Sequence, residues 1–240
     1  MNYSDYLELD TLLNLQRPRV PASLGRVRAA EHFFIIVHQG SELWLAQILL
    51  DLDHAAAALS APGGGELAVE HLTRVAAAFR VLHGQVMTLD QLPHQCFAQF
   101  RPYLGTASGA ESAQFQELDQ RLGVGTGPSP VAGAFAAALA RAGLDLVQVC
   151  RADLDACGLN RILNTLLAVA QDYWLWKVAH LAAVSRMLGH TAGTAGTTGA
   201  DHLASRVVMP FPELRHAQQL AHFVDPGAEA PADRPPDRAA

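Results

Sequence analysis

The stretch EHFFIIVHQGSELWLAQILLDL, residues 31–52, places apolar side chains at the alternating three- and four-residue spacing of an amphipathic α-helix. A helix of this length must pack its apolar face against other parts of the chain. The residues predicted for that face are Ala30, Phe33, Phe34, Val37, Ser41, Trp44, Leu45 and Ile48. His38 lies at the edge of this stripe, one helical turn after Phe34. Taken alone, such a histidine is expected to be a core-edge side chain bonded to a neighbour.

Helical spacing recurs along the chain, and no segment alternates with the two-residue period of a strand. The pattern predicts helices over 3–15, 28–60, 67–91, 111–122 and 130–142, and two long stretches from about 146 to 188. Glycines and prolines predict loops at APGGGE, 61–66, and GVGTGPSP, 123–130. We therefore expect an all-α fold, a single-domain helical bundle over residues 1–224. The Pro-, Ala- and charge-rich tail, 225–240, is predicted to be disordered.

Composition excludes several classes of protein. Half of the 240 residues are hydrophobic, which excludes a disordered chain, and the net charge of -6 argues against nucleic-acid binding. No unbroken apolar run reaches the ~18 to 20 residues that span a bilayer, so no membrane partner is predicted. The start, MNYSDYLELD, lacks the basic segment of a secretory signal. Cys96, Cys150 and Cys157 form no CxxC pair, which favours a reducing, cytoplasmic location.

A second histidine, His180, lies on the more apolar segment YWLWKVAHLAAVSRMLGH. Tyr173, Trp176, Val184 and Met187 share its helical face, so the imidazole is expected in an apolar slot with an aromatic wall. A buried imidazole without a partner loses about 1 to 3 kcal/mol, and a backbone carbonyl, a metal ion or a haem iron would each supply one. The other histidines show no HxxxH or HExxH spacing, so a closed zinc site is not predicted.

Arg101 lies in the segment QCFAQFRPYLGTASGAESAQF, 95–115, among Phe97, Phe100 and Tyr103. An arginine held by aromatic rings beside a turn of small residues suits bidentate recognition of a carboxylate. The alternative is a surface arginine stacked on a ring.

The segment GHTAGTAGTTGADHL, 189–203, is rich in glycine and threonine. Glycines let backbone N–H groups approach a ligand closely, and the hydroxyl groups add donors and acceptors. The segment lacks the GK[ST] ending and the preceding strand of a phosphate-binding P-loop. The alternative is a flexible linker.

Several of these segments, in the same order, resemble the tryptophan 2,3-dioxygenase superfamily of haem enzymes. The matching segments are YSDYLELDTLL (3–13), EHFFIIVHQGSELWLAQIL (31–49), FRPYLGTASG (100–109), WLWKVAHLAAVSRMLGHTAGTAGTTG (174–199) and FPEL (211–214). The second and fourth are long and rich in uncommon residue types. The resemblance implies a helical bundle that encloses a b-type haem.

The resemblance also implies roles for individual residues. His180 matches the proximal histidine that ligates the haem iron, and His38 matches the distal histidine near the substrate indole N–H. Phe34 matches an aromatic side chain that packs on the indole. Arg101 matches the arginine that pairs with the amino-acid carboxylate, and Thr194 the threonine that contacts the ammonium and carboxylate.

Other matched residues concern the cofactor and the assembly. Ser108 matches the family's small-residue turn beside the haem, Gly193 belongs to the matching glycine loop, and Trp176 lines the slot expected for the cofactor. Tyr3 and Tyr6 match N-terminal tyrosines that reach a neighbouring subunit's pocket, which implies a homotetramer.

The chain also departs from the family pattern. Phe97 stands where the family has a tyrosine, and the family's GTGGS loop reads GTAGT over 193–197. The stretch between Leu122 and Tyr173 is tens of residues shorter than in ordinary members. These changes favour a specialised enzyme and leave the reaction outcome open.

The implied function is a haem-dependent oxygenase acting at the indole C2–C3 bond of L-tryptophan or a substituted tryptophan, with O₂ or peroxide as oxidant. Entry of two oxygen atoms breaks this bond and gives N-formylkynurenine, whereas entry of one gives a hydroxylated or 2-oxindole product. Two alternatives are a haem sensor or carrier without turnover and a helical interaction protein without cofactor. Arg101 and Thr194 argue against the sensor, because neither is needed to hold haem.

Overall fold

The computed structural model of the chain describes residues 1–240 except 126, 153–157, 190, 192–199 and 224–240. All regular structure in the described residues is helical, with no strand among them, so the prediction of an all-α fold is confirmed. The tail predicted to be disordered, 225–240, lies outside the described residues. The single domain over 1–224 stays a prediction.

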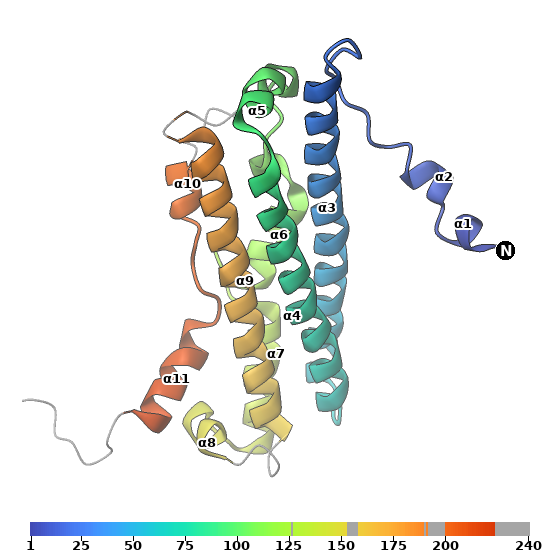
Figure 1. The fold of residues 1–240 in the computed structure, drawn as a ribbon. Helices are drawn as coiled ribbons and strands as arrows, with labels where there is room; N and C mark the ends of the chain where they lie inside the picture. Colours follow the sequence, from blue (N-terminus) through green and yellow to red (C-terminus); the bar gives the residue numbers. More distant parts are fainter. Residues whose placement is uncertain (126, 153–157, 190, 192–199, 224–240) are drawn as a thin grey trace, which may run out of the picture.

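Three long helices, α3, α4 and α9, run side by side and dominate the molecule (Figure 1). In chain order the elements are α1 (Tyr3–Tyr6), α2 (Leu9–Leu12), α3 (Gly25–Ser60), α4 (Gly65–Thr88), η1 (Leu89–Gln91), α5 (His94–Phe100), η2 (Arg101–Leu104), η3 (Gly109–Glu111), α6 (Ala113–Arg121), α7 (Pro130–Ala142), α8 (Leu146–Arg151), α9 (Gly158–Leu188), α10 (Ala200–Ala204) and α11 (Pro212–His222). The η elements are short 3₁₀-helices.

Local signals in the sequence explain where several helices begin and end. Helix α7 spans the predicted residues 130–142 because Ser129 caps its first turn, Pro130 fits the first helical position and Gly143 adopts φ +67° after its end. The single helix predicted over 3–15 is wrong. Glu8 adopts a left-handed conformation, φ +51°, and separates α1 from α2.

Helix α4 packs against both α3 and α9, so the main core lies along α4. Phe79 of α4 contacts the rings of Tyr173 and Trp176 of α9, at centroid distances of 5.6 Å and 5.8 Å. These three side chains are fully buried, and burial of a side chain of this size stabilises the fold by about 1.5 to 3 kcal/mol. A smaller core cluster joins the first half of α3 to α5 and includes Val37 and Phe100.

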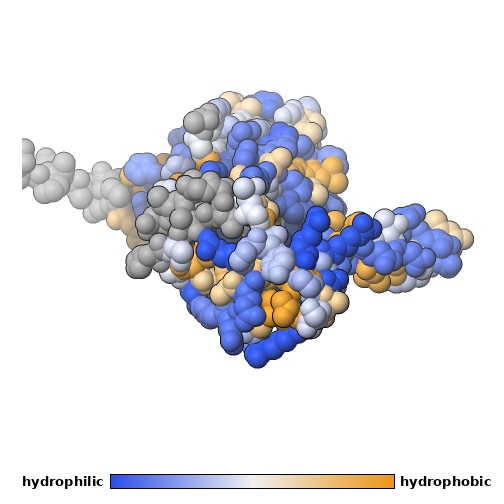
Figure 2. All heavy atoms as spheres, turned by 90° about the horizontal axis from the view of Figure 1, so that it is seen from above, coloured by the Kyte–Doolittle hydropathy of each residue, from blue (hydrophilic) through white to orange (hydrophobic). Residues whose placement is uncertain are grey.

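The chain before α3 is tied to that helix only from Leu15 onward. The buried carboxylate of Glu31 accepts hydrogen bonds from the backbone N–H groups of Arg19 and Val20, both at 2.8 Å, and Gln39 donates to the Leu15 carbonyl at 3.2 Å. Residues 1–13, here called the N-terminal arm, contribute no buried residue. The arm stands away from the bundle in both views (Figures 1 and 2).

The apolar face of α3 is narrower than predicted. Ser41, Leu45 and Ile48 are buried, but Trp44 is 40% exposed, so its assignment to the packed face is wrong. The buried seam runs mainly at positions one turn apart, and Trp44 falls beside it. By length and composition α3 could cross a membrane, with a mean hydropathy of 1.4 over 18 residues, but the core helix of a water-soluble protein passes the same test.

Candidate functional site

His38 lies in the middle of α3, and its ring is oriented by its own helix. Its Nδ1 is 2.7 Å from the carbonyl oxygen of Phe34. A carbonyl only accepts, so Nδ1 carries the hydrogen and donates, which leaves a lone pair on Nε2. The Phe34 ring lies against the imidazole, with the centroids 3.9 Å apart and the planes at 33°. The side chain therefore presents an acceptor beside an aromatic surface.

His180 of α9 lies in aromatic surroundings. Phe115 of α6 stacks on Trp176, with centroids 5.4 Å apart, and its ring lies 6.4 Å from that of His180. Desolvation lowers the pKa of His180 to about 4, and the charges of His38 and Lys177 act in the same direction. The imidazole is therefore neutral near pH 7, which is the form that binds a metal ion.

The structure brings His38 and His180 together from two different helices, near enough for the charge of His38 to lower the pKa of His180. His38 is exposed to solvent, yet desolvation by the surrounding protein also lowers its pKa, and the Phe34 carbonyl and Glu42 oppose that shift only in part. The lowered pKa favours the neutral imidazole at His38.

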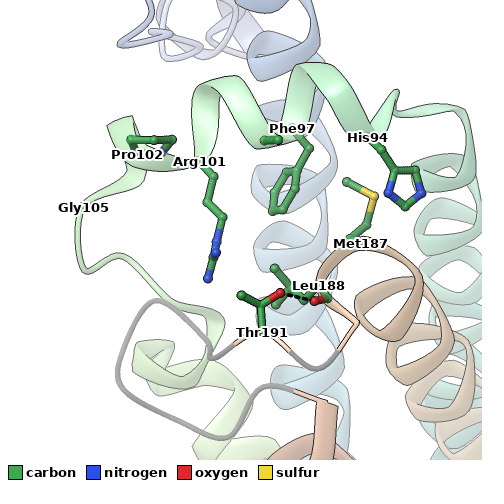
Figure 3. A pocket seen from close by; sticks show the side chains of 9 residues that line it. His94, Phe97, Arg101, Pro102, Gly105, Met187, Leu188 and Thr191 are labelled. Atoms are coloured by element: carbon green, nitrogen blue, oxygen red, sulfur yellow. Dashed lines mark hydrogen bonds between the residues drawn. The ribbon is translucent and has the colours of Figure 1, made fainter.

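A cleft of about 540 Å³ lies between α5, η2 and the end of α9 (Figure 3). Its volume is in the range typical of small-molecule sites. The side chain of Arg101 points into it from η2, toward Thr191. The lining residues are His94, Phe97, Ala98, Arg101, Pro102, Gly105, Met187, Leu188 and Thr191. The cleft therefore combines a cation with apolar walls.

Phe34 connects this cleft to the histidines. Besides contacting His38, its ring lies 6.1 Å from Phe97, which lines the cleft, and 5.4 Å from Phe100. Phe34 and Phe97, from α3 and α5, form an aromatic contact that leads from His38 to the cleft with Arg101, and the buried Phe100 packs against both rings. A flat apolar molecule with a carboxylate at one end fits such a surface in shape and polarity.

The aromatic surroundings predicted for Arg101 are only partly found. Phe97 shares its cleft, whereas Phe100 is fully buried in the smaller core cluster. Tyr103 is 43% exposed and is not part of the cleft lining. Arg101 begins a 3₁₀-helix of about 3 residues per turn, and Tyr103, two positions later, therefore projects in another direction.

Arg186 fixes the two sides of the cleft relative to one another. From α9 it donates to Asp90 at 3.0 Å, to the Leu89 carbonyl at 2.6 Å and to Nε2 of His94 at 3.0 Å. The end of α9 is thereby held against η1 and the first residue of α5. Sequence reasoning did not find this contact, because its partners lie more than ninety positions away.

Thr191 and His94 also line the cleft without having been predicted. The Thr191 hydroxyl donates to the carbonyl of Leu188, just after Gly189 ends α9 with φ +55°. The signal for Thr191 was its membership of the Gly/Thr-rich segment. Gly193 and Thr194, the predicted ligand contacts in that segment, lie outside the described residues.

Ser108 caps the short helix η3 and is not part of the cleft lining. Its hydroxyl oxygen accepts from the N–H of Ala110 at 3.3 Å, and its own N–H donates to Glu111 at 3.1 Å. The hydroxyl hydrogen can still be donated to an anionic group. The turn before it contains Gly105 at φ +59°, a conformation that favours glycine.

The buried indole N–H of Trp176 has no hydrogen-bond acceptor among the described residues. Leaving a buried donor unsatisfied costs about 1 to 3 kcal/mol, which indicates that a partner belongs next to it. Trp176 lies one turn before His180 on α9. A polar group of a bound cofactor, or a water molecule beside it, would supply the acceptor.

Asp119 of α6 forms a buried polar network with α9. It accepts hydrogen bonds from the Tyr173 hydroxyl at 2.8 Å, from Lys177 at 3.4 Å and from Arg206 at 2.7 Å. Burial lowers the pKa of Lys177, and Asp119 opposes that shift. The network holds α6, and with it Phe115, against the part of α9 that carries His180. No pattern in the sequence pointed to it.

Tyr3 and Tyr6 lie on the N-terminal arm, 75% and 69% exposed. Neither lines the cleft of its own chain. The structure therefore brings together Phe34, His38, Arg101, Trp176 and His180, and leaves the two tyrosines outside.

The sequence of the chain matches a family of known proteins. The family model described as tryptophan 2,3-dioxygenase matches residues 1–128, a span that contains His38 and Arg101. A protein of Anaeromyxobacter dehalogenans (strain 2CP-C) named tryptophan 2,3-dioxygenase is 30% identical over 261 residues, covering 89% of this chain and 94% of the relative. Proteins with the same name from Anaeromyxobacter sp. (strain K), 29% identical over 89% of this chain and 94% of the relative, and from Arthrobacter sp. (strain FB24), 30% identical over 89% of each, are similar. The chain belongs to the tryptophan 2,3-dioxygenase family.

Proposed function

We propose that the chain is a haem-dependent oxygenase that inserts oxygen at the indole C2–C3 bond of L-tryptophan or a substituted tryptophan. The observation that carries the proposal is the contact of His38 with Phe34, which leads through Phe97 to a cleft that contains Arg101. Helix α9 contributes the neutral His180. The relatives named tryptophan 2,3-dioxygenase match along nearly their whole length, which supports tryptophan as the substrate class.

The residues beside His180 fit a b-type haem. The neutral imidazole of His180 would hold the haem iron, and Phe115 and Trp176 would supply apolar surface beside it. The unsatisfied N–H of Trp176 and the hydroxyl hydrogen of Ser108 are donors suited to the anionic propionates or to water between them. Gly193 is proposed to contact the cofactor from the Gly/Thr-rich segment.

Each remaining residue has a separate part in binding the substrate. Haem, when bound, supplies the binding and activation of O₂ or peroxide. Arg101 pairs with the substrate carboxylate, a charge-assisted contact of about 1.5 to 3 kcal/mol. Nε2 of His38 accepts the indole N–H, because Nδ1 already donates to the Phe34 carbonyl. Phe34 packs on the indole ring, and Thr194 contacts the ammonium and carboxylate groups.

Two products are compatible with this arrangement, because both need the same binding residues. The names of the relatives favour entry of two oxygen atoms, with ring opening to N-formylkynurenine. Entry of one atom, giving a hydroxylated or 2-oxindole product, is the second candidate. It is favoured by the altered loop 193–197 and by the shorter chain. The alignment with the Anaeromyxobacter relative covers 261 positions, more than the 240 residues of this chain, so this chain has gaps where the relative has residues.

The assembly proposed from the family resemblance is a homotetramer. The exposed tyrosines of the N-terminal arm, and the arm's separation from its own bundle, support contact with a neighbouring subunit (Figure 1). The cytoplasmic location stays a prediction.

The test is to express the protein with added haem and to identify the products by mass spectrometry. L-Tryptophan and ring-methylated tryptophans are supplied under ¹⁸O₂, and in parallel with H₂¹⁸O₂. Two labelled atoms in N-formylkynurenine support ring opening, and one labelled atom supports the single-oxygen product. A red protein without any product contradicts the oxygenase and favours the sensor or carrier. A colourless protein contradicts haem binding and favours a helical interaction protein.

A further inference from the structure

A second group of potential metal ligands lies far from the proposed haem site. Asp51 and His54 of α3 are three positions apart and share one side of that helix, and His71 reaches them from α4. One ligand atom from each residue lies within 4.8 Å of the others. Asp51 and His71 are buried, at 2% and 8% exposure, whereas His54 is exposed.

The types of ligand in this group suit a borderline-soft cation. Imidazole nitrogen and carboxylate oxygen bind Zn²⁺, Co²⁺ and Ni²⁺, whereas Mg²⁺ and Ca²⁺ prefer sets made of oxygen. Around tetrahedral Zn²⁺, ligand atoms lie about 3.3 Å apart, given bond lengths of about 2.0 to 2.1 Å. Asp51 and His71 are already close, at 2.7 Å between Oδ1 and Nδ1, and the exposed His54 can rotate toward them. The two imidazole rings are 5.0 Å apart at their centroids.

The side chain of Arg74 already pairs with Asp51 and His71 of this group. The guanidinium of Arg74 contacts both carboxylate oxygens of Asp51, with its shortest contact at 2.8 Å, and lies 2.7 Å from Nδ1 of His71. Gln47 also donates to Oδ2 of Asp51 at 2.8 Å. The ion pair with Arg74 balances the charge of the Asp51 carboxylate.

Arg74 has a second partner to which it can move. Its Nη1 donates to Glu70, one turn earlier on α4, at 2.6 Å, and its side chain is 46% exposed. If the guanidinium turns toward Glu70, it leaves Asp51 without losing all of its ion pairing. A divalent cation then takes over the balance of the Asp51 charge.

We propose that Asp51, His54 and His71 form a binding site for Zn²⁺ or a similar divalent cation, which clips α3 to α4 and displaces Arg74 toward Glu70. Three protein ligands leave a coordination position for water. Thirteen positions along α3 separate Asp51 from His38, a distance of about 20 Å at 1.5 Å per residue. The site is therefore separate from the haem site and acts on the stability of the bundle.

The test is titration of the purified protein with Co²⁺ and then Zn²⁺. We expect uptake of one Co²⁺ per chain with the visible spectrum of a four-coordinate ion, which Zn²⁺ abolishes on displacing it. Zn²⁺ at a hundredfold excess over its dissociation constant should raise the melting temperature by about 5 to 10 °C. His54→Ala should lose the Co²⁺ spectrum and the temperature shift, because it removes one of the three ligands. The variant should still fold, because the exposed His54 side chain is not part of the core.

Two further variants separate this site from other histidines. His32→Ala removes another exposed histidine of α3 and should bind Co²⁺ like the unmodified protein. Arg74→Gln removes the competing charge and should bind about tenfold more tightly or better. No uptake by the unmodified protein, equal uptake by His54→Ala, or weaker binding by Arg74→Gln would each overturn the proposal. None of these outcomes depends on haem or on turnover.

Discussion

Two histidines with the same side chain are suited to different work because their neighbours differ. The hydrogen bond from Nδ1 of His38 to the Phe34 carbonyl orients its ring and leaves Nε2 as an acceptor. His180 instead lies beside Phe115, with desolvation lowering its pKa to about 4. The first environment suits the positioning of a substrate N–H, and the second suits a metal bond.

Replacing each histidine separately distinguishes these roles. His180→Ala should abolish stable haem binding, because the bond to the iron is lost and the aromatic walls alone hold the group weakly. His38→Ala should keep the haem and lower kcat/KM for L-tryptophan by about tenfold to a hundredfold, because the hydrogen bond from the indole N–H to Nε2 is lost. The measurements are the Soret spectrum and steady-state kinetics.

His32→Ala is the control, because this histidine is exposed on α3 and outside both sites. It should leave spectrum and kinetics unchanged. Loss of haem in His38→Ala together with its retention in His180→Ala would reverse the two assignments.

Arg101 gives the prediction for substrate recognition. Its side chain points into the cleft, so a free amino acid satisfies the guanidinium, whereas tryptamine offers no carboxylate. A charge-assisted contact with the carboxylate contributes about 1.5 to 3 kcal/mol, so L-tryptophan should be preferred by about tenfold to a hundredfold in kcat/KM. Arg101→Leu should lose most activity on L-tryptophan and narrow that preference.

Arg101→Lys is the matched variant. It keeps the charge but lacks the planar guanidinium that pairs with both carboxylate oxygens. Its kcat/KM for L-tryptophan should therefore fall between those of the unmodified protein and Arg101→Leu. Equal turnover of L-tryptophan and tryptamine by the unmodified protein would rule out a carboxylate contact at Arg101.

At the scale of elements, the sequence predicted what local spacing determines and missed what distant contacts determine. Helix α7 was predicted at both ends because Ser129 and Gly143 act within their own turns. The exposure of Trp44 depends on where neighbouring helices lie, and the break at Glu8 is a single left-handed residue that helical spacing does not reveal. The roles of His38, His180 and Arg101 were predicted from the family resemblance and stay predictions, whereas the grouping of Asp51 with His71 needed the packing of α3 on α4.

The Asp119 network gives the prediction for the contact between α6 and α9. Asp119→Ala leaves the buried Lys177 without its carboxylate and removes the acceptor of the Tyr173 hydroxyl. Breaking a buried ion pair by removing one partner costs about 3 to 5 kcal/mol in free energy of unfolding. Urea unfolding, followed by circular dichroism, measures this loss.

Glu117→Ala is the control on the same helix, two residues earlier. Its ion pair with Arg121 is exposed, and Arg121 keeps Asp53 as a second partner at 3.0 Å. The loss should be at most about 0.5 kcal/mol. Equal losses for the two variants would show that the Asp119 network does not stabilise the α6–α9 contact.

At the scale of the whole molecule, the N-terminal arm carries exposed apolar side chains that no other part of the described chain covers. Tyr3, Tyr6 and Leu13 are each about 70% exposed on it, and no residue of α1 or α2 is buried. Exposed apolar side chains that gather on one segment usually mark a surface for another protein chain. Hydrogen bonds between α3 and the chain before it begin at Leu15, after the arm ends.

Deletion of residues 1–13 should therefore leave the bundle folded and weaken the assembly. We expect circular dichroism per residue and the melting temperature at low protein concentration to be preserved. Light scattering after gel filtration should show a smaller species than the homotetramer proposed for the full chain. If the arm's tyrosines complete a neighbouring cleft, as proposed, the deletion should also raise KM for L-tryptophan.

Mixing experiments decide whether the arm acts on another chain. Chains lacking 1–13 keep their own cleft, and His180→Ala chains keep their arm but lack the proposed iron ligand. If the arm of one subunit completes the cleft of another, the mixed assembly should be more active at low L-tryptophan concentration than either parent, because intact arms then reach intact clefts. A mixture of the deletion with a Tyr3→Ala, Tyr6→Ala, His180→Ala chain should recover much less. Full activity of the deletion on its own would show that the arm takes no part in the site.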